Sequence, residues 1–478
     1  MDRPTALDLA FLDLETPQAP LHVGWTLRFG GRAPSIAALR RHLDARLGAV
    51  PRFRRRLAHG TWVDDVRFDV AHHAFGVTAP APGGAEQLRE VAGVLLSRPL
   101  PLNRPLWRMY LVDGLDGGFA IVGQAHHALV DGVAAIEVAQ LLFGPEAAYG
   151  RDGRAWAPEA APAAGAALWA TAETRARAAA GAVRDAAGAL WGTEPGVPRP
   201  DSAARATEVL RTAARAVDAL THRQPPTSLE RSATARRLVA YAGVPLDAVR
   251  AAGARREATV NDVLLAATSI ALRAALRRRG DARETVRALV PVNVRGEAGG
   301  EAVGNRISFL AVELPVGEPA PDRVLTLVHA RTVAGKAGGD AGALEALGRA
   351  ADALPGPGRR AVARAALRAV PFTLVVSNVP GPPATLALLG RPLRAIHPMV
   401  PLLHGHALTV GAVSYDGRLH VGLAADAEVV PDVVDLARDL EAAFDALRLA
   451  PPEAVVDVAE PPWRARARAR RGQRAANR

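Results

Sequence analysis

The chain is 478 residues long, carries a formal net charge of +11 and contains no cysteine. One ordinary hydrophobic core does not extend over this length, so two domains are expected. The missing cysteine excludes a disulfide framework, a thiol nucleophile and a thiolate metal site. It fits a reducing compartment, and a cytoplasmic location is expected because the N-terminus lacks the pattern of a secretory signal. No uncharged apolar run reaches the ~20 residues of a membrane span, which leaves peripheral association open.

Much of the positive charge lies at the C-terminus. The tail from Trp463 onward holds seven arginines and no acidic residue, which leaves a charge of +4 for the rest of the chain. Residues 451–478 are predicted to form a solvated, disordered basic arm, and a weak anchor to anionic lipid is the alternative. Lys336 is the only lysine among 59 basic residues, a composition that indicates GC-rich codons more than a nucleic-acid partner.

The first part of the chain mixes strand and helix patterns. Within residues 1–145, the stretches 21–30 and 117–127 are strand-like, and residues 35–50 have helical spacing. Residues 146–230 differ, because Pro/Ala-rich runs and long Ala/Arg stretches predict a helical crossover between two parts of the fold.

The α/β pattern resumes in residues 231–450. A hairpin is predicted to turn at Asp416-Gly417, a pair typical of tight turns. Further strands are predicted over 236–245, 286–294, 306–316 and 372–380, and helices over 259–280 and 432–447.

Residues 125–132 read AHHALVDG. If strand alternation continues through the pair, His126 and His127 lie on opposite faces, and only one of them can face a given cavity. Gly132 is predicted to supply a permissive turn before a helix. Asp131 lies at the strand-to-helix turn, where it can fix the loop or pair with an arginine.

Three interpretations of this stretch are open on its spacing alone: strand-end histidines with satisfied hydrogen bonds, a metal site, or the base of an enzyme. A metal site is the weakest, because no third ligand lies nearby at a recognised spacing. His404 and His406 share a strand face far along the chain and do not complete a ligand set. A second pair, His72 and His73, has no following Asp-Gly and is predicted to be structural.

HHALVDG matches the HHxxxDG motif of the acyltransferase superfamily that includes chloramphenicol acetyltransferase and the condensation domains of peptide synthetases. The flanks LDLAFLDLETPQAPLHVG, RPLWRMYLVDGLDGG, TVNDVLLA, PVNVR and SNVPGPP narrow the resemblance. With them, the chain resembles the bacterial wax ester synthase/diacylglycerol acyltransferase family up to about residue 450. One departure is Ser228-Leu229-Glu230, where the family tends to carry Ser-Leu-Asn. It bears on the choice of acceptor more than on the chemistry.

The resemblance implies an α/β fold of two chloramphenicol-acetyltransferase-like mixed-sheet halves, residues 1–145 and 231–450, with the reaction channel between them. It implies an O-acyltransferase that moves a long-chain acyl group from acyl-CoA to diacylglycerol, giving triacylglycerol, or to a fatty alcohol, giving a wax ester. Acyl-CoA is then a substrate, and no cofactor or metal is expected. The lipid acceptor implies peripheral association with a membrane or lipid droplet.

Carried over to this chain, the resemblance makes His127 the general base. His126 is expected to support the loop, with Gly132, and Asp131 to organise it by pairing with Arg295. A surface position for Arg295 is the alternative.

Other motif residues have local explanations as well. Thr259 is predicted to cap a helix, and Asn261 and Asp262 then lie in its first turn, where acceptors and negative charge are favoured. The functional alternative is that Asn261 and Asp262 belong to the substrate channel. Asn378 is a similar candidate for orienting the acceptor or the oxyanion, whereas Trp107 is expected in the core.

Two rival functions stay open. One is a carrier-protein-dependent or small-alcohol acyltransferase of the same superfamily. The other is a catalytically silent lipid-binding or interaction protein, against which the intact HHxxxDG motif argues.

Overall fold

The structure, a computed structural model, describes residues 4–58, 60–145, 156–159, 225–231, 234–293, 307–337 and 371–449. Most of the predicted crossover, the motif residue Arg295 and the predicted basic arm lie outside these ranges. Within them, no helix combines the length and the apolar character needed to cross a membrane.

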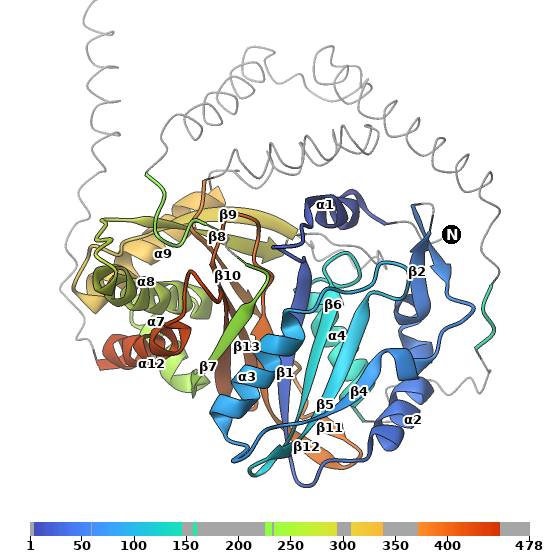
Figure 1. The fold of residues 1–478 in the computed structure, drawn as a ribbon. Coiled ribbons are helices and arrows are strands. Elements are labelled where there is room, and N and C mark those ends of the chain that lie inside the picture. Colours follow the sequence, from blue (N-terminus) through green and yellow to red (C-terminus); the bar gives the residue numbers. More distant parts are fainter. Residues whose placement is uncertain are drawn as a thin grey trace, which may run out of the picture.

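Two six-stranded mixed sheets lie next to each other in the centre of the molecule (Figure 1). In the first, only β4 and β5 are parallel neighbours. Its order is β11 (Ala387–Leu388), β12 (Arg391–Met399), β1 (His22–Gly30), β6 (Gly118–His126), β5 (Trp107–Leu115) and β4 (Ala74–Thr78). A separate hairpin pairs β2 (Arg55–Ala58) with β3 (Thr61–Asp64).

In the second sheet, β10 runs parallel to both of its neighbours. The order is β7 (Arg237–Pro245), β14 (Arg418–Asp426), β13 (Leu408–Tyr415), β10 (Leu374–Val379), β8 (Val286–Asn293) and β9 (Ile307–Leu314). The hairpin of β13 and β14 turns at Asp416 and Gly417 with φ of 47° and 71°, as the Asp-Gly pair predicted.

Helices pack against the sheets through their apolar stripes. On the second sheet these are α7 (Leu246–Ala254), α8 (Val260–Arg278), α9 (Pro321–Ala337) and α12 (Val433–Leu449), gathered on one side in Figure 1. The first half carries α1 (Ala6–Leu14), α2 (Ile36–Arg46), α3 (Ala85–Leu96) and α4 (Gly132–Phe143). The α/β class and the two mixed sheets confirm the predicted fold.

One connection was not predicted: β12, from the C-terminal part of the chain, belongs to the first sheet and pairs antiparallel with β1. Glycines on the second sheet make room for it. A Cβ added to Gly422 would lie 2.0 Å from the carbonyl oxygen of Pro398, and one at Gly411 would lie 3.0 Å from Val400. The two halves therefore interlock through β12, and a boundary near residue 231 does not separate the two sheets.

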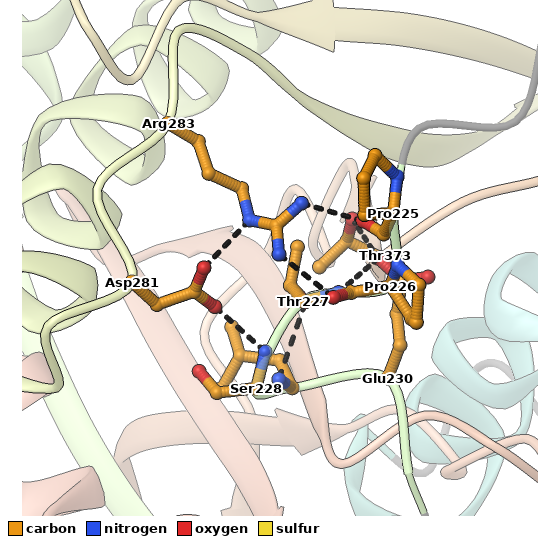
Figure 2. A network of polar contacts seen from close by, with 9 residues as sticks. Pro225, Pro226, Thr227, Ser228, Glu230, Asp281, Arg283 and Thr373 are labelled. Carbon is orange, nitrogen blue, oxygen red and sulfur yellow. Dashed lines mark hydrogen bonds and ion pairs between the residues drawn. The ribbon is translucent and has the colours of Figure 1, made fainter.

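A polar network fixes the segment 225–231 onto the second half (Figure 2). The Arg283 guanidinium donates to Asp281 at 2.7 Å and to the Pro226 carbonyl at 2.7 Å. Glu230 accepts from the Thr373 hydroxyl at 2.9 Å and from the Thr227 N–H at 3.3 Å. Since Thr373 directly precedes β10, the Glu230 side chain anchors the start of a central strand.

Candidate active site

A cavity of about 400 Å³ lies between the two sheets. Its wall combines β1, β12 and α4 with residues from β10 and β13, and most of the lining side chains are aliphatic or aromatic. The polar exceptions are His127, Asp131, Glu137, Ser377 and Asn378. Mainly apolar cavities of this size with a few polar groups are typical of small-molecule and lipid sites.

His127 follows the last residue of β6 and lines the cavity. Its N–H donates to the Leu21 carbonyl at 2.9 Å, which ties it to the chain leading into β1. The Phe11 ring is stacked on its imidazole, with centroids 3.9 Å apart and planes 15° apart. Burial lowers the pKa of His127 to about 4, against the raising effects of a hydrogen bond with its own backbone and of the Asp131 charge. The imidazole is therefore neutral near pH 7.

His126 is fully buried and does not line the cavity. Its Nδ1 accepts the Ala128 N–H at 3.0 Å, so the ring proton is on Nε2. That nitrogen lies 3.7 Å from a carboxylate oxygen of Glu15. Burial alone would raise the pKa of Glu15, but the adjacent His126 and the Leu21 N–H outweigh burial and lower it. The first motif histidine is thus part of the support behind the turn.

Asp131 and Gly132 form the junction between this turn and α4. Asp131 is the N-cap of α4 and accepts the Ala134 N–H at 2.7 Å, a bond that satisfies a donor at the start of the helix. The predicted permissive turn at Gly132 is wrong, because Gly132 is the first residue of the helix and has no positive φ. Glycine is instead required by close approach: a Cβ there would lie 2.9 Å from Cγ2 of Val379.

The second half contributes the end of β10 to the cavity. Ser377 and Asn378 both line it, and Asn378 pairs with Ala412 of β13. The strand is followed by Gly381, whose added Cβ would lie 1.8 Å from the Ser414 carbonyl oxygen. This glycine allows the chain to pass close over β13, and the SNVPGPP block thereby keeps Asn378 at the cavity wall.

Asn261 and Asp262 do not line this cavity. The predicted cap is confirmed: Thr259 and Asp262 form a capping box at the start of α8. Asp262 also accepts from His329 at 3.0 Å and from Thr332 at 2.7 Å, both on α9. Burial raises its pKa, but these hydrogen bonds prevail and lower it. Asp262 therefore joins α8 to α9.

The remaining predictions concern residues elsewhere. Trp107 lies in the core, as predicted, with its indole N–H donating to the Phe53 carbonyl at 2.7 Å. The predicted strand face shared by His404 and His406 is wrong, because both residues precede β13 in a turn where Gly405 has φ of 88°. The His406 ring is stacked on Phe372, with centroids 3.8 Å apart. Among the described residues, no group of three or more His, Cys, Asp or Glu side chains could hold a metal ion. Arg295 is outside the described ranges, so its pairing with Asp131 stays a prediction.

Two residues at the site were not predicted from the sequence: Phe11 and Glu15. Both belong to the block LDLAFLDLETPQAPLHVG, and they are four residues apart, a spacing that brings side chains to one face of a helix. That spacing was the available signal, but nothing in it indicates that this face meets the two motif histidines.

A half-buried motif histidine thus lines an apolar cavity at the junction of two interlocked mixed sheets, which fits the HHxxxDG acyltransferases that the sequence resembles. Residues 5–264 match the family model "Wax ester synthase/diacylglycerol acyltransferase catalytic domain", and residues 303–448 match "WS/DGAT C-terminal domain". The chain therefore belongs to the wax ester synthase/diacylglycerol acyltransferase family and is an acyltransferase.

Individual relatives agree with this assignment. The chain is 31% identical to "Probable diacyglycerol O-acyltransferase tgs1" of Mycobacterium tuberculosis, over 94% of this chain and 96% of the relative. It is 27% identical to "O-acyltransferase WSD" of Acinetobacter baylyi, over 91% and 94%. The solved wax ester synthase/diacylglycerol acyltransferase of Marinobacter aquaeolei VT8 shares the fold, with a TM-score of 0.64, 24% identity and coverage of 94% and 99%. A condensation domain of the calcium-dependent antibiotic synthetase has a TM-score of 0.59 at 19% identity, covering 96% and 98%.

Proposed function

We propose that the protein transfers a long-chain acyl group from acyl-CoA to the hydroxyl of a diacylglycerol or a fatty alcohol, with His127 as the general base. The observation that carries the proposal is the position of the His127 imidazole at an apolar cavity between the two halves. The names of the family model and of its relatives, wax ester synthase and diacylglycerol acyltransferase, support the two acceptor classes. The apolar lining supports a lipid over a small polar acceptor.

The reaction needs a base because a hydroxyl is a poor nucleophile at neutral pH. As the acceptor oxygen attacks the thioester carbonyl, His127 takes its proton. The tetrahedral intermediate then breaks its C–S bond, and the imidazolium returns the proton to the departing CoA thiolate. The products are an ester and free CoA, with no net proton change, no acyl-enzyme and no oxidation. Of the two ring nitrogens, Nδ1 is fully enclosed, so Nε2 is the nitrogen assigned to the proton transfer.

The low pKa of His127 has two opposing effects on its role as a general base. Burial keeps the ring neutral and able to accept a proton. The same burial makes it a weaker base than a histidine with an ordinary pKa, because Brønsted behaviour favours a pKa near the working pH. The Asp131 carboxylate offsets part of this loss, since its charge raises the pKa of His127.

The tetrahedral intermediate also needs a donor to its oxyanion. Asn378 is our candidate, because its side-chain amide can donate hydrogen bonds and it lines the same cavity as His127. Ser377 lies beside it along β10 and lines the cavity too.

Because diacylglycerols and long-chain alcohols reside in bilayers or droplets, we place the enzyme peripherally at such a surface in the cytoplasm. Residues 463–478 are assigned an auxiliary electrostatic role there, worth up to about 1 kcal/mol for each arginine near an anionic surface. Their removal should weaken binding to anionic vesicles and leave turnover on a water-soluble alcohol unchanged. Resistance of the full chain to extraction by high salt and carbonate would contradict peripheral binding.

The test of the function is a thiol-release assay on the purified chain, with palmitoyl-CoA and either dioleoylglycerol or hexadecanol in mixed micelles, and with the ester product identified by mass spectrometry. CoA and ester should form in equal amounts, and only when an alcohol is present. Release of CoA without ester would indicate a thioesterase. Binding of acyl-CoA without turnover on any alcohol would indicate a silent lipid-binding protein.

A further inference from the structure

The segment of residues 5–21 contacts both histidines of the motif, although it is more than 100 residues away in sequence. Phe11 is stacked on the His127 imidazole, Glu15 lies 3.7 Å from Nε2 of His126, and the Leu21 carbonyl accepts the His127 N–H. Three contacts of different chemical kinds thus meet a single turn.

This segment is itself held from both ends. Thr5 and Asp8 form a capping box that starts α1, and Asp8 is fully buried. After the helix, a turn is closed by the bridge between Thr16 and Ala19. The Arg237 guanidinium, from β7 of the second half, donates to the Gln18 carbonyl in that turn at 2.7 Å. A segment anchored in this way can impose a position on the side chains that it touches.

Phe11 acts on the plane of the His127 ring. The outer torsion of a histidine side chain has broad, shallow minima, so neighbouring groups must fix the ring plane. With its centroid 3.9 Å away and its plane nearly parallel, the Phe11 ring fixes it and covers one face of the imidazole. Only 7% of Phe11 is exposed, so water does not reach this face by passing through its position.

Glu15 acts through His126. The Ala128 N–H fixes the His126 tautomer and thereby directs its Nε2–H toward the Glu15 carboxylate. Because the His126 carbonyl in turn accepts the Leu129 N–H at 2.8 Å, the same residue also closes the turn from which His127 projects. Holding the His126 ring therefore holds this turn.

We propose that Phe11 and Glu15 are positioning residues of the acyltransferase: Phe11 holds and shields the imidazole of His127, and Glu15 holds the turn that carries it through His126. The proposal rests on the function proposed for His127. The segment of residues 5–21 then contributes to the reaction by positioning the motif, and it does not itself contact the substrates.

The two residues have different expected signatures because different charges surround the two histidines. Asp131 and His126 are the charged or titratable groups that act on His127, while Glu15 and His22 interact electrostatically with His126. Burial is the largest influence on His127, so uncovering its ring should raise its pKa from about 4 toward the ordinary 6.5. Loss of Glu15 should lower kcat without this rise.

The experiment on Phe11 compares Phe11→Ala, Phe11→Leu and Phe11→Tyr with Leu12→Ala, a matched control on the same helix that also packs against the first-half core. We expect Phe11→Ala to lower kcat by about 10- to 100-fold. It should also move the acid limb of the pH–rate profile upward by about one pH unit or more. Phe11→Tyr should retain both properties, and Phe11→Leu, which keeps apolar volume without a planar ring, covers the case in which the alanine variant does not fold.

The pKa of His127 is read independently of turnover from the ring resonances of 13C-histidine-labelled protein, assigned with His127→Asn. If Phe11→Ala, or Phe11→Leu where the alanine variant is unfolded, matches Leu12→Ala in kcat, pH–rate profile and ring pKa, the positioning role of Phe11 is rejected. If His127→Asn itself keeps wild-type turnover, the proposed function of His127 fails instead. The two failures are thereby distinguished.

For Glu15, the informative pair is Glu15→Ala and Glu15→Gln, since glutamine keeps an acceptor for the Leu21 N–H, which lies 3.4 Å from the carboxylate. Glu15→Ala should lower kcat about 10-fold, and glutamine should restore most of it. In a His126→Asn background the alanine substitution should lower kcat much less than in the wild type, because most of its effect is exerted through His126. Additive losses in the double variant would overturn the assignment.

Discussion

The molecule contains two adjacent histidine pairs in its first half, and their comparison separates burial from function. In each pair one histidine has a pKa lowered to about 4, chiefly by burial: His73 in one and His127 in the other. His73 donates to the Trp107 carbonyl at 2.9 Å and is stacked on the Trp107 ring, and it lines no part of the cavity. His127 is stacked on the Phe11 ring and lines the cavity.

A low pKa and an aromatic neighbour are therefore common to a structural and a candidate catalytic histidine. What differs is the chain that follows. After His73 the chain enters β4, whereas after His127 it makes a turn capped by Asp131 and starts α4 against the second half. The Asp-Gly of the motif is thus what brings the second histidine to the junction of the two sheets.

The largest difference between the pairs is expected in turnover. His127→Ala should lower kcat by about 10²–10⁴-fold through loss of the general base, with a circular dichroism spectrum like that of the wild type. His73→Ala should change kcat by no more than a few-fold and should lower the melting temperature, because it leaves a gap beside Trp107. Wild-type turnover of His127→Ala in the thiol-release assay would remove the distinction between the two pairs.

Asp131 has two separable effects: its charge acts on His127, and its side chain caps α4. Two substitutions distinguish these effects. Asp131→Asn keeps an acceptor for the Ala134 N–H but removes the charge that raises the pKa of His127. The acid limb of the pH–rate profile should then move to lower pH, and kcat should fall about 10-fold as the base weakens. Asp131→Ala also loses the cap and should cost about 1 kcal/mol of stability in urea unfolding.

A larger loss in Asp131→Ala, of about 3–5 kcal/mol, is expected if Asp131 also pairs with Arg295. In that case a double-mutant cycle of the two residues should be strongly non-additive. Equal stability of the asparagine and alanine variants would show that the cap contributes little.

A substitution at Gly132 tests the contact between the start of α4 and the end of β10. Among the described residues, the His72–His73 pair is not followed by a contact of this kind. In Gly132→Ala the new methyl group would lie 2.9 Å from Cγ2 of Val379, so the end of β10 must move by a few tenths of an ångström. Because Asn378 adjoins Val379, we expect kcat to fall several-fold with a destabilisation of about 1–3 kcal/mol. The control is Gly117→Ala at a turn in the same half, where φ of 72° is strained but nothing lies within 4 Å. Gly117→Ala should lose stability and keep the kcat of the wild type. If Gly132→Ala behaves in the same way, the close approach of Gly132 to Val379 has no role in turnover.

Local patterns predicted the elements well, and contacts between distant segments were beyond them. Period-two alternation and the Asp-Gly pair identified β6 and the hairpin of β13 and β14, because these signals arise within a few residues. The position of β12 in the first sheet requires glycine at residue 422, because a side chain there would clash with Pro398. A glycine in the sequence does not indicate which distant segment packs against it.

The site shows the same division. The motif indicated His127, and the structure puts it at the cavity wall with Asn378. The stacking of Phe11 and the role of Asp262 in joining α8 to α9 depend on how remote segments pack, so the sequence carried no signal for either.

The smallest expected effect concerns acid stability, which the two pairs should share. His73 titrates near its ordinary pKa of 6.5 in the unfolded chain and at about 4 in the folded one. Its contribution to folding is thus complete above pH 6.5 and is lost as the pH falls toward 4, because the unfolded state takes up the proton first.

His73→Asn keeps a side-chain N–H for the Trp107 carbonyl and removes the titration. Between about pH 7 and pH 4.5, the free energy of unfolding in urea should fall less in this variant than in the wild type, by about 1–3 kcal/mol. His72→Asn, at the exposed neighbour, is the matched control. If both variants lose stability with the slope of the wild type, the buried ring of His73 does not contribute to acid unfolding.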